Sequence, residues 1–260
     1  MAIDGLMLLG ENRFGPALEV RDATNLAEAL DLAAIVAAPA RPFDYVLEPA
    51  NERLALAANE SNGRLHVLGR IDPLDGQGAV REAARCLVDL HTVGLFLHPA
   101  EEAFPVRVAR PVLEVAREHR APVVIATGFF GLSEPLQIAE LAASFPEVPI
   151  VMTTGGQINI SGLSMVDAWL ALTQTPNLHV MTNGEYRQDF IERLASEFDH
   201  RRVLYASFAP VFDPVFELAR VRSARFAPEV RRAIEHDNAA RLFGLERDGR
   251  AEDVGGGGQV

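Results

Sequence analysis

Residues 151–156 read VMTTGG, an apolar run that stops at two threonines and a glycine pair. Such a run is typical of a short strand that is buried on both faces, because its residues do not alternate between apolar and polar. The glycine pair is typical of a tight turn between the strand and a following helix. The same arrangement, a short apolar run followed by a longer amphipathic run, recurs along the chain.

Counting these apolar runs predicts the fold. Between them, apolar residues recur at steps of three and four, which indicates helices; the first of these patterns covers residues 24–33. Eight strand–helix units in about 240 residues are typical of one α/β domain, a (β/α)8 TIM barrel of eight parallel strands. The predicted strands are 3–9, 34–38, 65–71, 94–98, 123–127, 149–153, 178–182 and 203–207.

The end of the chain differs from the repeating part. Two further helices are predicted at residues 214–223 and 228–243. The barrel domain is therefore expected to cover residues 1–245. Residues 246–260 are polar and rich in glycine, which indicates a C-terminal tail outside the core.

The basic residues exclude several kinds of chemistry. All 24 are arginine, because the chain contains no lysine. A Schiff-base aldolase and a pyridoxal phosphate enzyme both need a lysine amine. A phosphate-binding P-loop also needs its lysine. No cofactor is predicted from the remaining residues.

Charge and cysteine content restrict the partners and the compartment. A net charge of −12 disfavours nucleic acid as a partner, because phosphate binding requires a basic surface. The single cysteine, Cys86, lies on the apolar stripe of a predicted helix and is interpreted as a core residue. We expect a cytoplasmic protein without a signal peptide, disulfide or membrane span.

The strand ends resemble, in order, those of the amidohydrolase-related ("amidohydrolase 2") family, which includes metal-dependent hydrolases and aminocarboxymuconate-semialdehyde-type decarboxylases. The similarity runs from Ile3 to about Leu245, and no single segment decides it. The matching segments are NGRLHVLGRIDP (62–73), GLFLHPAEEAFP (94–105), APVVIATG (121–128), VPIVMTTGG (148–156), PNLHVMTNG (176–184), HRRVLYASFAP (200–210) and HDNAARLFGL (236–245).

The resemblance also implies where the family's metal ligands would stand, and none is present. Leu6 and Leu8 take the place of the His-x-His pair on the first strand. Ala126 replaces a histidine on the fifth strand and Phe208 an aspartate on the eighth. Thr154 replaces a histidine on the sixth strand, which the resemblance implies would hold the water or the substrate. Residues 6 and 8 point to the same side of a strand, so these side chains should form an apolar lining inside the barrel. We therefore expect a protein without bound metal, since zinc needs three or four N, S or O donors.

Several polar residues remain at the predicted strand ends. His98 could act as an acid or base, and Thr154 with the backbone of Gly155 and Gly156 could hold an oxyanion or carboxylate. Asp72 could act as a base, or it could pair with nearby Arg70. Each of these residues also has a purely structural interpretation, as a hydrogen-bonding or turn residue.

Substrate anchors are predicted in the neighbouring loops. Arg13 and Arg41 have the shape to bind a substrate carboxylate, and Asn183 follows the seventh strand as Thr154 follows the sixth. A relocated metal site is a further hypothesis, with Glu11, Asp72, His98 and Glu185 as its candidate ligands.

Two main hypotheses for the function follow. The first is a pseudoenzyme, a non-catalytic ligand-binding protein or partner subunit. The second is a metal-independent hydrolase or lyase, decarboxylase-like, that acts on a small, partly apolar carboxylic acid. The resemblance implies oligomers, either a homo-oligomer or a heteromer with a metal-competent paralogue.

Overall fold

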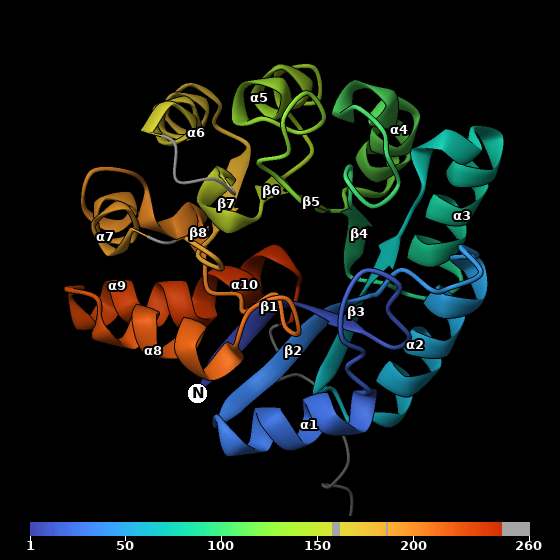
Figure 1. Ribbon diagram of the computed structural model, residues 1–260, viewed down its shortest axis with the longest axis horizontal. Helices are drawn as coiled ribbons and strands as arrows, with labels where there is room; N and C mark the ends of the chain where they lie inside the picture. The colour runs from blue at the N-terminus through green and yellow to red at the C-terminus, as the bar shows by residue number, and fades with distance from the viewer. Residues whose placement is uncertain (158–161, 186, 246–260) are drawn as a thin grey trace, which may run out of the picture.

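The computed structural model describes residues 1–157, 162–185 and 187–245. Eight strands form one sheet in chain order, every neighbouring pair is parallel, and helices surround the sheet (Figure 1). The predicted TIM barrel is therefore confirmed. The strands are β1 (Ala2–Leu9), β2 (Leu32–Pro39), β3 (Leu65–Arg70), β4 (Gly94–Leu97), β5 (Val123–Ile125), β6 (Ile150–Met152), β7 (Leu178–Met181) and β8 (Val203–Leu204).

The barrel closes between β1 and the chain that follows β8. The N–H of Leu8 donates to the carbonyl of Ala209 over 2.7 Å, and the N–H of Phe208 donates to the carbonyl of Leu6 over 2.8 Å. At Gly5 a Cβ atom would lie only 2.8 Å from the carbonyl oxygen of Tyr205. Glycine therefore permits the close approach of the two segments.

Helices cover the outside of the barrel, and three short helical elements follow the eighth strand–helix unit. The predicted helix at 228–243 is divided, because its middle adopts a π-helical turn at Ala233–Asp237. Within the described ranges, no helix has the length and hydropathy needed to cross a bilayer. The α-helices are α1 (Val20–Ala29), α2 (Glu48–Glu60), α3 (Gln77–Val88), α4 (Arg110–His119), α5 (Pro135–Ala143), α6 (Gly162–Gln174), α7 (Gln188–Ser196), α8 (Pro214–Ser223), α9 (Pro228–Arg232) and α10 (Asn238–Leu242).

The first helix is displaced from its predicted position. The periodicity at 24–33 predicted a helix there, but α1 covers Val20–Ala29. The helix cannot continue because Asp31 has a left-handed backbone, with φ 55°, and Leu32 pairs with Ala2 in the sheet. Leu32 and Ala33, the last apolar residues of the predicted helix, therefore belong to β2.

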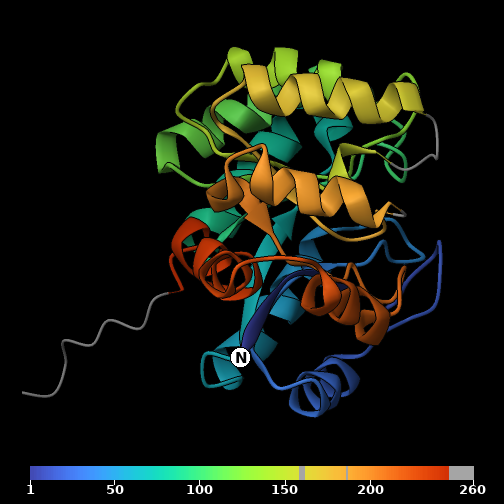
Figure 2. The ribbon, with the colours of Figure 1, turned by 90° about the vertical axis from the view of Figure 1, so that its left-hand side faces the viewer.

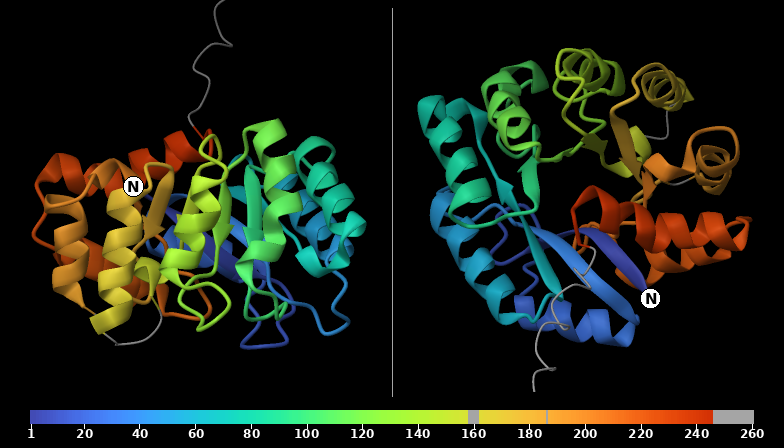
Figure 3. Two further views of the ribbon diagram at one scale, coloured as in Figure 1. Left: turned by 90° about the horizontal axis from the view of Figure 1, so that it is seen from above. Right: turned by 180° about the vertical axis from the view of Figure 1, so that it is seen from behind.

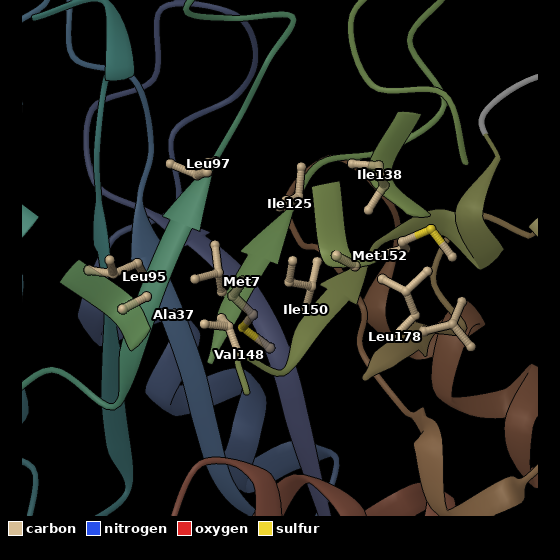
Figure 4. Packing of buried hydrophobic residues seen from close by; sticks show 14 of the residues in the cluster. Met7, Ala37, Leu95, Leu97, Ile125, Ile138, Val148, Ile150, Met152 and Leu178 are labelled. Carbon is tan, nitrogen blue, oxygen red and sulfur yellow. The ribbon is translucent and has the colours of Figure 1, made fainter. Parts of the chain in front are cut away.

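Apolar side chains form two layers, one on each side of the sheet. An outer layer lies between strands and helices; Figure 4 shows part of it, including Leu95, Leu97, Ile125 and Ile150. An inner layer fills the barrel. The alternation of side chains along each strand separates the two layers. Members of the inner layer include Leu6, Leu8, Val36, Leu68, Phe96, Val124, Val151, Met181 and Leu204.

Cys86 belongs to the outer layer, so its interpretation as a core residue is confirmed. Its Sγ lies 3.4 Å from a carboxylate oxygen of Glu82. Burial, together with the negative charge of Glu82, raises the pKa of the thiol well above its usual range. The thiol therefore stays protonated and unreactive.

The loops that follow the carboxyl ends of the strands lie together at one end of the barrel, at the lower edge of Figure 3, left, and on the right of Figure 2. In barrels of this kind, functional side chains gather at this end. The residues predicted to form a site all lie on these strand ends and loops.

Candidate functional site

One side of the barrel mouth is apolar. Leu6, Leu8, Ala126 and Phe208 all belong to the inner layer, and none is more than 5% exposed. The register of β1 is irregular between Asp4 and Met7, which allows Ile3 to face inward as well as Leu6 and Leu8. The four positions that the resemblance assigns to metal ligands thus lie within one buried apolar cluster.

Aromatic rings cover this cluster from the loop side, and we call Phe96, His98, Phe129, Phe208 and Phe212 the aromatic plug. The rings of His98 and Phe208 are stacked, with centroids 6.2 Å apart. Phe129 lies 5.4 Å from His98, and Phe212 lies 6.3 Å from Phe208. Since His98 and Phe208 are each 5% exposed, the plug closes the centre of the barrel mouth.

Both ring nitrogens of His98 face Glu101. The backbone N–H of Glu101 lies 3.2 Å from Nδ1 and donates to it, and Nε2 lies 3.5 Å from the Glu101 carboxylate. Burial, together with the positive charge of Arg70, holds the pKa of His98 well below its ordinary value. The imidazole is therefore neutral at physiological pH; Glu101 donates to one ring nitrogen and its carboxylate lies near the other.

A buried arginine organises the charges beside His98. Arg70 is completely buried, and its guanidinium donates to the Glu102 carboxylate over 2.6 and 3.0 Å and to the carbonyl of Pro39 over 3.1 Å. It also donates to the Glu101 carboxylate. Burial raises the pKa of Glu102 to about 7, although the positive charges of Arg70 and Arg41 oppose the shift. Arg70 pairs with these glutamates and not with Asp72, the partner considered from the sequence.

The predicted substrate anchors have partners within the protein. Arg41 is 5% exposed and donates to Glu102 over 3.2 Å and to Asp72 over 3.4 Å. Arg13 is exposed and donates to the hydroxyl of Tyr45, whose ring lies between the Arg13 and Arg41 guanidinium groups, 5.0 Å from each. The guanidinium groups of Arg13 and Arg41 therefore already interact with other side chains of this protein.

Thr154 and Asn183 bind each other. The backbone N–H of Thr154 donates to the Asn183 side-chain oxygen over 3.2 Å, and the Asn183 amide donates back to the Thr154 hydroxyl over 3.3 Å. The N–H of Gly156 donates to the carbonyl of Thr153. Thr154 has φ 56°, a left-handed conformation that is strained for a β-branched residue. Many of the hydrogen-bonding groups of this turn therefore bind one another, which stabilises the conformation of the turn.

Glu185 and Gln157 form a buried pair that the sequence did not single out. The Gln157 amide donates to the Glu185 carboxylate over 2.6 Å, and Glu185 is 1% exposed. Burial raises the pKa of Glu185 to about 7, against the stabilising hydrogen bond from the Arg187 N–H. The carboxylate lies against Gly155, where a Cβ atom would be 2.5 Å from its oxygen. The sequence presents Glu185 as a loop carboxylate and as a candidate ligand of a relocated metal site, but nothing in it pairs Glu185 with Gln157.

The residues present do not fit a metal centre. Among the described residues, no group of three or more histidine, cysteine, aspartate or glutamate side chains could hold a metal ion. The relocated site of Glu11, Asp72, His98 and Glu185 is therefore wrong as a group. The four residues belong to separate loops, and the nitrogens of His98 already face Glu101.

The best-formed cavities on the described parts of the chain do not include the centre of the barrel mouth. None of them is lined by His98, Thr154, Asn183 or Phe208. A mainly apolar cavity of about 340 Å³ lies between α1, α2 and the start of β2. One of about 430 Å³ adjoins Arg70 and Asp72, between the loops that follow β2 and β3.

Asp4 is buried in β1 and has no basic partner among the groups that shift its pKa. Its carboxylate accepts from the N–H of Ser207 over 2.8 Å and of Leu6 over 3.2 Å. Burial raises its pKa from 3.8 to about 6, and these hydrogen bonds oppose the shift. The folded state therefore binds more protons than the unfolded state between these pH values, so that stability falls as the pH rises through this window.

Asp4→Asn should remove this pH dependence, because a neutral side chain carries no cost of burying a charge while its oxygen still accepts both N–H groups. We expect the variant to be more stable than the wild type at pH 8 by about 1–3 kcal/mol. Near pH 4 the free energies of unfolding of the two proteins should be similar. Urea unfolding at both pH values measures the difference, and a wild type that is the more stable at pH 8 would contradict this account.

The chain matches the amidohydrolase family model over residues 7–245. Comparison with curated proteins gives no significant match. Solved structures share the fold. The 2,6-dihydroxybenzoate decarboxylase from Rhizobium has 16% identity and a TM-score of 0.72, with 94% of this chain and 98% of that chain covered.

Two other solved structures are similar to the same extent. A dihydroxybenzoic acid decarboxylase from Polaromonas sp. JS666, with bound manganese and 2-nitroresorcinol, has 17% identity and a TM-score of 0.73, covering 95% of this chain and 97% of that one. An uncharacterized TIM-barrel protein from Bordetella bronchiseptica has 18% identity and a TM-score of 0.76, covering 94% and 98%. At these identities the likeness to solved structures shows the fold alone. The family-model match extends over most of the barrel, and the chain belongs to the amidohydrolase family.

Proposed function

We propose that this protein is a non-catalytic, metal-free member of its family, which acts as a ligand-binding or partner subunit. The observation that carries the proposal is the stacking of Phe208 on His98, with centroids 6.2 Å apart inside the aromatic plug. Phe208 stands where the resemblance would place an aspartate ligand. An aromatic ring there supplies no donor to a metal, and it fills space that a substrate would need.

The surrounding charges support this proposal. Arg70 binds Glu101 and Glu102, Arg41 binds Glu102, and Glu101 also lies beside both nitrogens of His98. A catalytic acid or base must reach a substrate atom directly or through one water. In this arrangement the ionisable groups of the mouth stabilise the fold.

A metal-independent lyase, with decarboxylase-like chemistry, is the alternative function. Glu102 favours it, because its pKa is about 7 and its Oε2 atom is buried without a hydrogen-bond partner in the described structure. Such a carboxyl group could exchange a proton near neutral pH. The decarboxylase names of the similar structures are consistent with this alternative.

Metal binding and turnover separate the two functions. The purified protein is incubated with Mn²⁺ or Zn²⁺, freed of excess ion and analysed for metal, and 2,6-dihydroxybenzoate and 5-carboxyvanillate are assayed for loss of CO₂. We expect substoichiometric metal and no turnover above buffer. Stoichiometric metal with metal-dependent turnover would overturn the proposal. Turnover that persists with chelator and disappears in Glu102→Gln would establish the alternative.

A matched variant tests whether these side chains control metal binding. In Leu6→His/Leu8→His/Ala126→His/Phe208→Asp, four donors replace the four apolar side chains of one cluster. We expect this variant to bind Zn²⁺ more tightly than the wild type, and binding to raise its unfolding temperature. Equal retention of zinc by both proteins would show that these positions do not control metal binding.

The predicted homo-oligomer, or heteromer with a metal-competent paralogue, stays a prediction.

A further inference from the structure

Exposed apolar side chains gather at the carboxyl end of the barrel. Eight of the fifteen large apolar residues exposed among the described residues lie in or directly after the loops that follow β8, β1, β2 and β3. We call these eight side chains the apolar face. Its members are Phe14, Phe43, Tyr45, Val46, Leu74, Val211, Val215 and Phe216.

Contacts between the loops hold the members of the apolar face at the same end of the barrel. The chain after β8 pairs with β1 at Ala209 and Met7, two residues before Val211. The loop after β1 bonds to the loop after β2, where the N–H of Arg13 donates to the carbonyl of Arg41 over 2.8 Å. Tyr45, Val46 and Leu74 line one cavity, which joins the loops after β2 and β3. Figures 1 and 2 show the dark-blue loop after β1 beside the orange loop after β8.

The exposed area is large enough for the centre of an interface. Phe14, Phe43, Tyr45 and Phe216 are 53%, 55%, 45% and 62% exposed. Because a whole aromatic side chain presents about 150–250 Å², these four alone expose on the order of 400 Å². Four aliphatic side chains add to this area. A stable interface covers about 800 Å² per partner, with an apolar centre and a polar rim.

Charge decides which kind of partner fits. In the loops 10–19, 40–47, 71–76 and 205–213, all of them described, Arg13 is the single exposed basic residue. A second copy in a twofold dimer would place acidic rims together, which is unfavourable. An anionic lipid surface would be repelled in the same way. The exposed acidic residues of these loops are Glu11, Glu19, Asp44, Asp75 and Asp213.

We propose that the apolar face docks a basic, amphipathic segment of a partner protein. Its apolar side would cover the aromatic residues, and its arginines or lysines would reach the surrounding carboxylates. The inference rests on the proposed function, because it identifies what a partner subunit of this kind would bind. It places the partner over the end of the barrel that the aromatic plug closes.

A designed amphipathic helical peptide with lysines on its polar side is the probe. Its fluorescence anisotropy is measured with the wild-type protein, and a matched peptide carries glutamate in place of every lysine. We expect the lysine peptide to bind, more weakly as salt increases, and the glutamate peptide not to bind. Phe43→Ser/Phe216→Ser should weaken binding about tenfold or more, because aromatic anchors dominate such interfaces.

Matched variants separate the effect of position from the effect of lost apolar surface. Val166→Ser/Leu170→Ser removes two exposed apolar side chains of α6, away from the apolar face, and should leave binding unchanged. Glu11→Gln/Asp75→Asn should lower the affinity and its dependence on salt. Thermal unfolding of each variant verifies the fold.

Three results would overturn the docking proposal. The first is equal binding of the two peptides, and the second is equal binding of the lysine peptide by the wild type and by Phe43→Ser/Phe216→Ser. The third is a wild-type dimer that this double variant dissociates, which would identify a second copy as the occupant. None of the three requires metal or turnover. A catalytically active protein would overturn the proposed function without changing peptide binding, so the two failures are distinguishable.

Discussion

Arg70→Met is expected to destabilise the protein by about 3–5 kcal/mol, since it removes the charge that compensates buried carboxylates. Arg70 is completely buried and donates to Glu102, to Glu101 and to the carbonyl of Pro39. Methionine keeps an unbranched apolar stem but not the guanidinium, so we expect most of the lost stability to come from the unpaired Glu102 carboxylate. Urea unfolding at neutral pH measures this loss.

The pH dependence identifies the carboxylate. Burial already raises the pKa of Glu102 to about 7, so the folded state takes up protons that the unfolded state has released, and stability falls as the pH rises towards 7. Without Arg70 the pKa should rise further. Arg70→Met should therefore lose less stability at pH 5, where Glu102 is largely protonated, than at pH 9.

A double variant provides the control. In Arg70→Met/Glu102→Gln the buried charge is absent, and we expect part of the lost stability to return. Arg117→Met, at a partly exposed pair with Glu114, should cost less than about 1 kcal/mol. A loss below 1 kcal/mol in Arg70→Met, or a double variant that is less stable than the single one, would contradict this role for Arg70.

Phe208→Ala is expected to cost about 3–5 kcal/mol, the usual range for truncating a buried phenylalanine. Phe208 is 5% exposed and contacts the rings of Phe96, His98 and Phe212 in the aromatic plug. Its loss should leave a cavity above Leu6 and Leu8. Phe130→Ala, at a side chain that is 91% exposed, should change stability by less than about 0.5 kcal/mol.

The backbone of Phe208 adds a second test. Its φ of 57° is left-handed, where a Cβ atom is unfavourable and glycine is not. Phe208→Gly should therefore be more stable than Phe208→Ala by about 1 kcal/mol, although it removes one more carbon. Chemical unfolding of both variants measures the difference. A glycine variant less stable than the alanine variant would show that the observed backbone conformation does not limit stability.

The pattern of apolar residues determined most of the fold. Each predicted strand overlaps an observed one, because buried strands in a parallel barrel are short and continuously apolar. The boundary between α1 and β2 was misplaced, since Leu32 can extend a helix or pair with Ala2, and only the sheet makes that choice. Likewise, the alternation along β1 gave no sign of the irregular register between Asp4 and Met7.

The candidate site was determined by sequence only in part. Side chains two apart on a strand share a face, which is enough to place Leu6 and Leu8 together, whereas Ala126 and Phe208 were placed inside the barrel by the resemblance; all four belong to the inner layer. Glu101 binds His98 across a local turn, three residues along the chain, whereas the partners of Arg70 were decided by tertiary structure. Glu101 and Glu102 lie in a loop 31 and 32 residues from Arg70, and Arg41 reaches Glu102 from 61 residues away. Local periodicity specifies which residues are buried, but the pairing of buried charges depends on where the folded loops bring them within a few ångströms of one another.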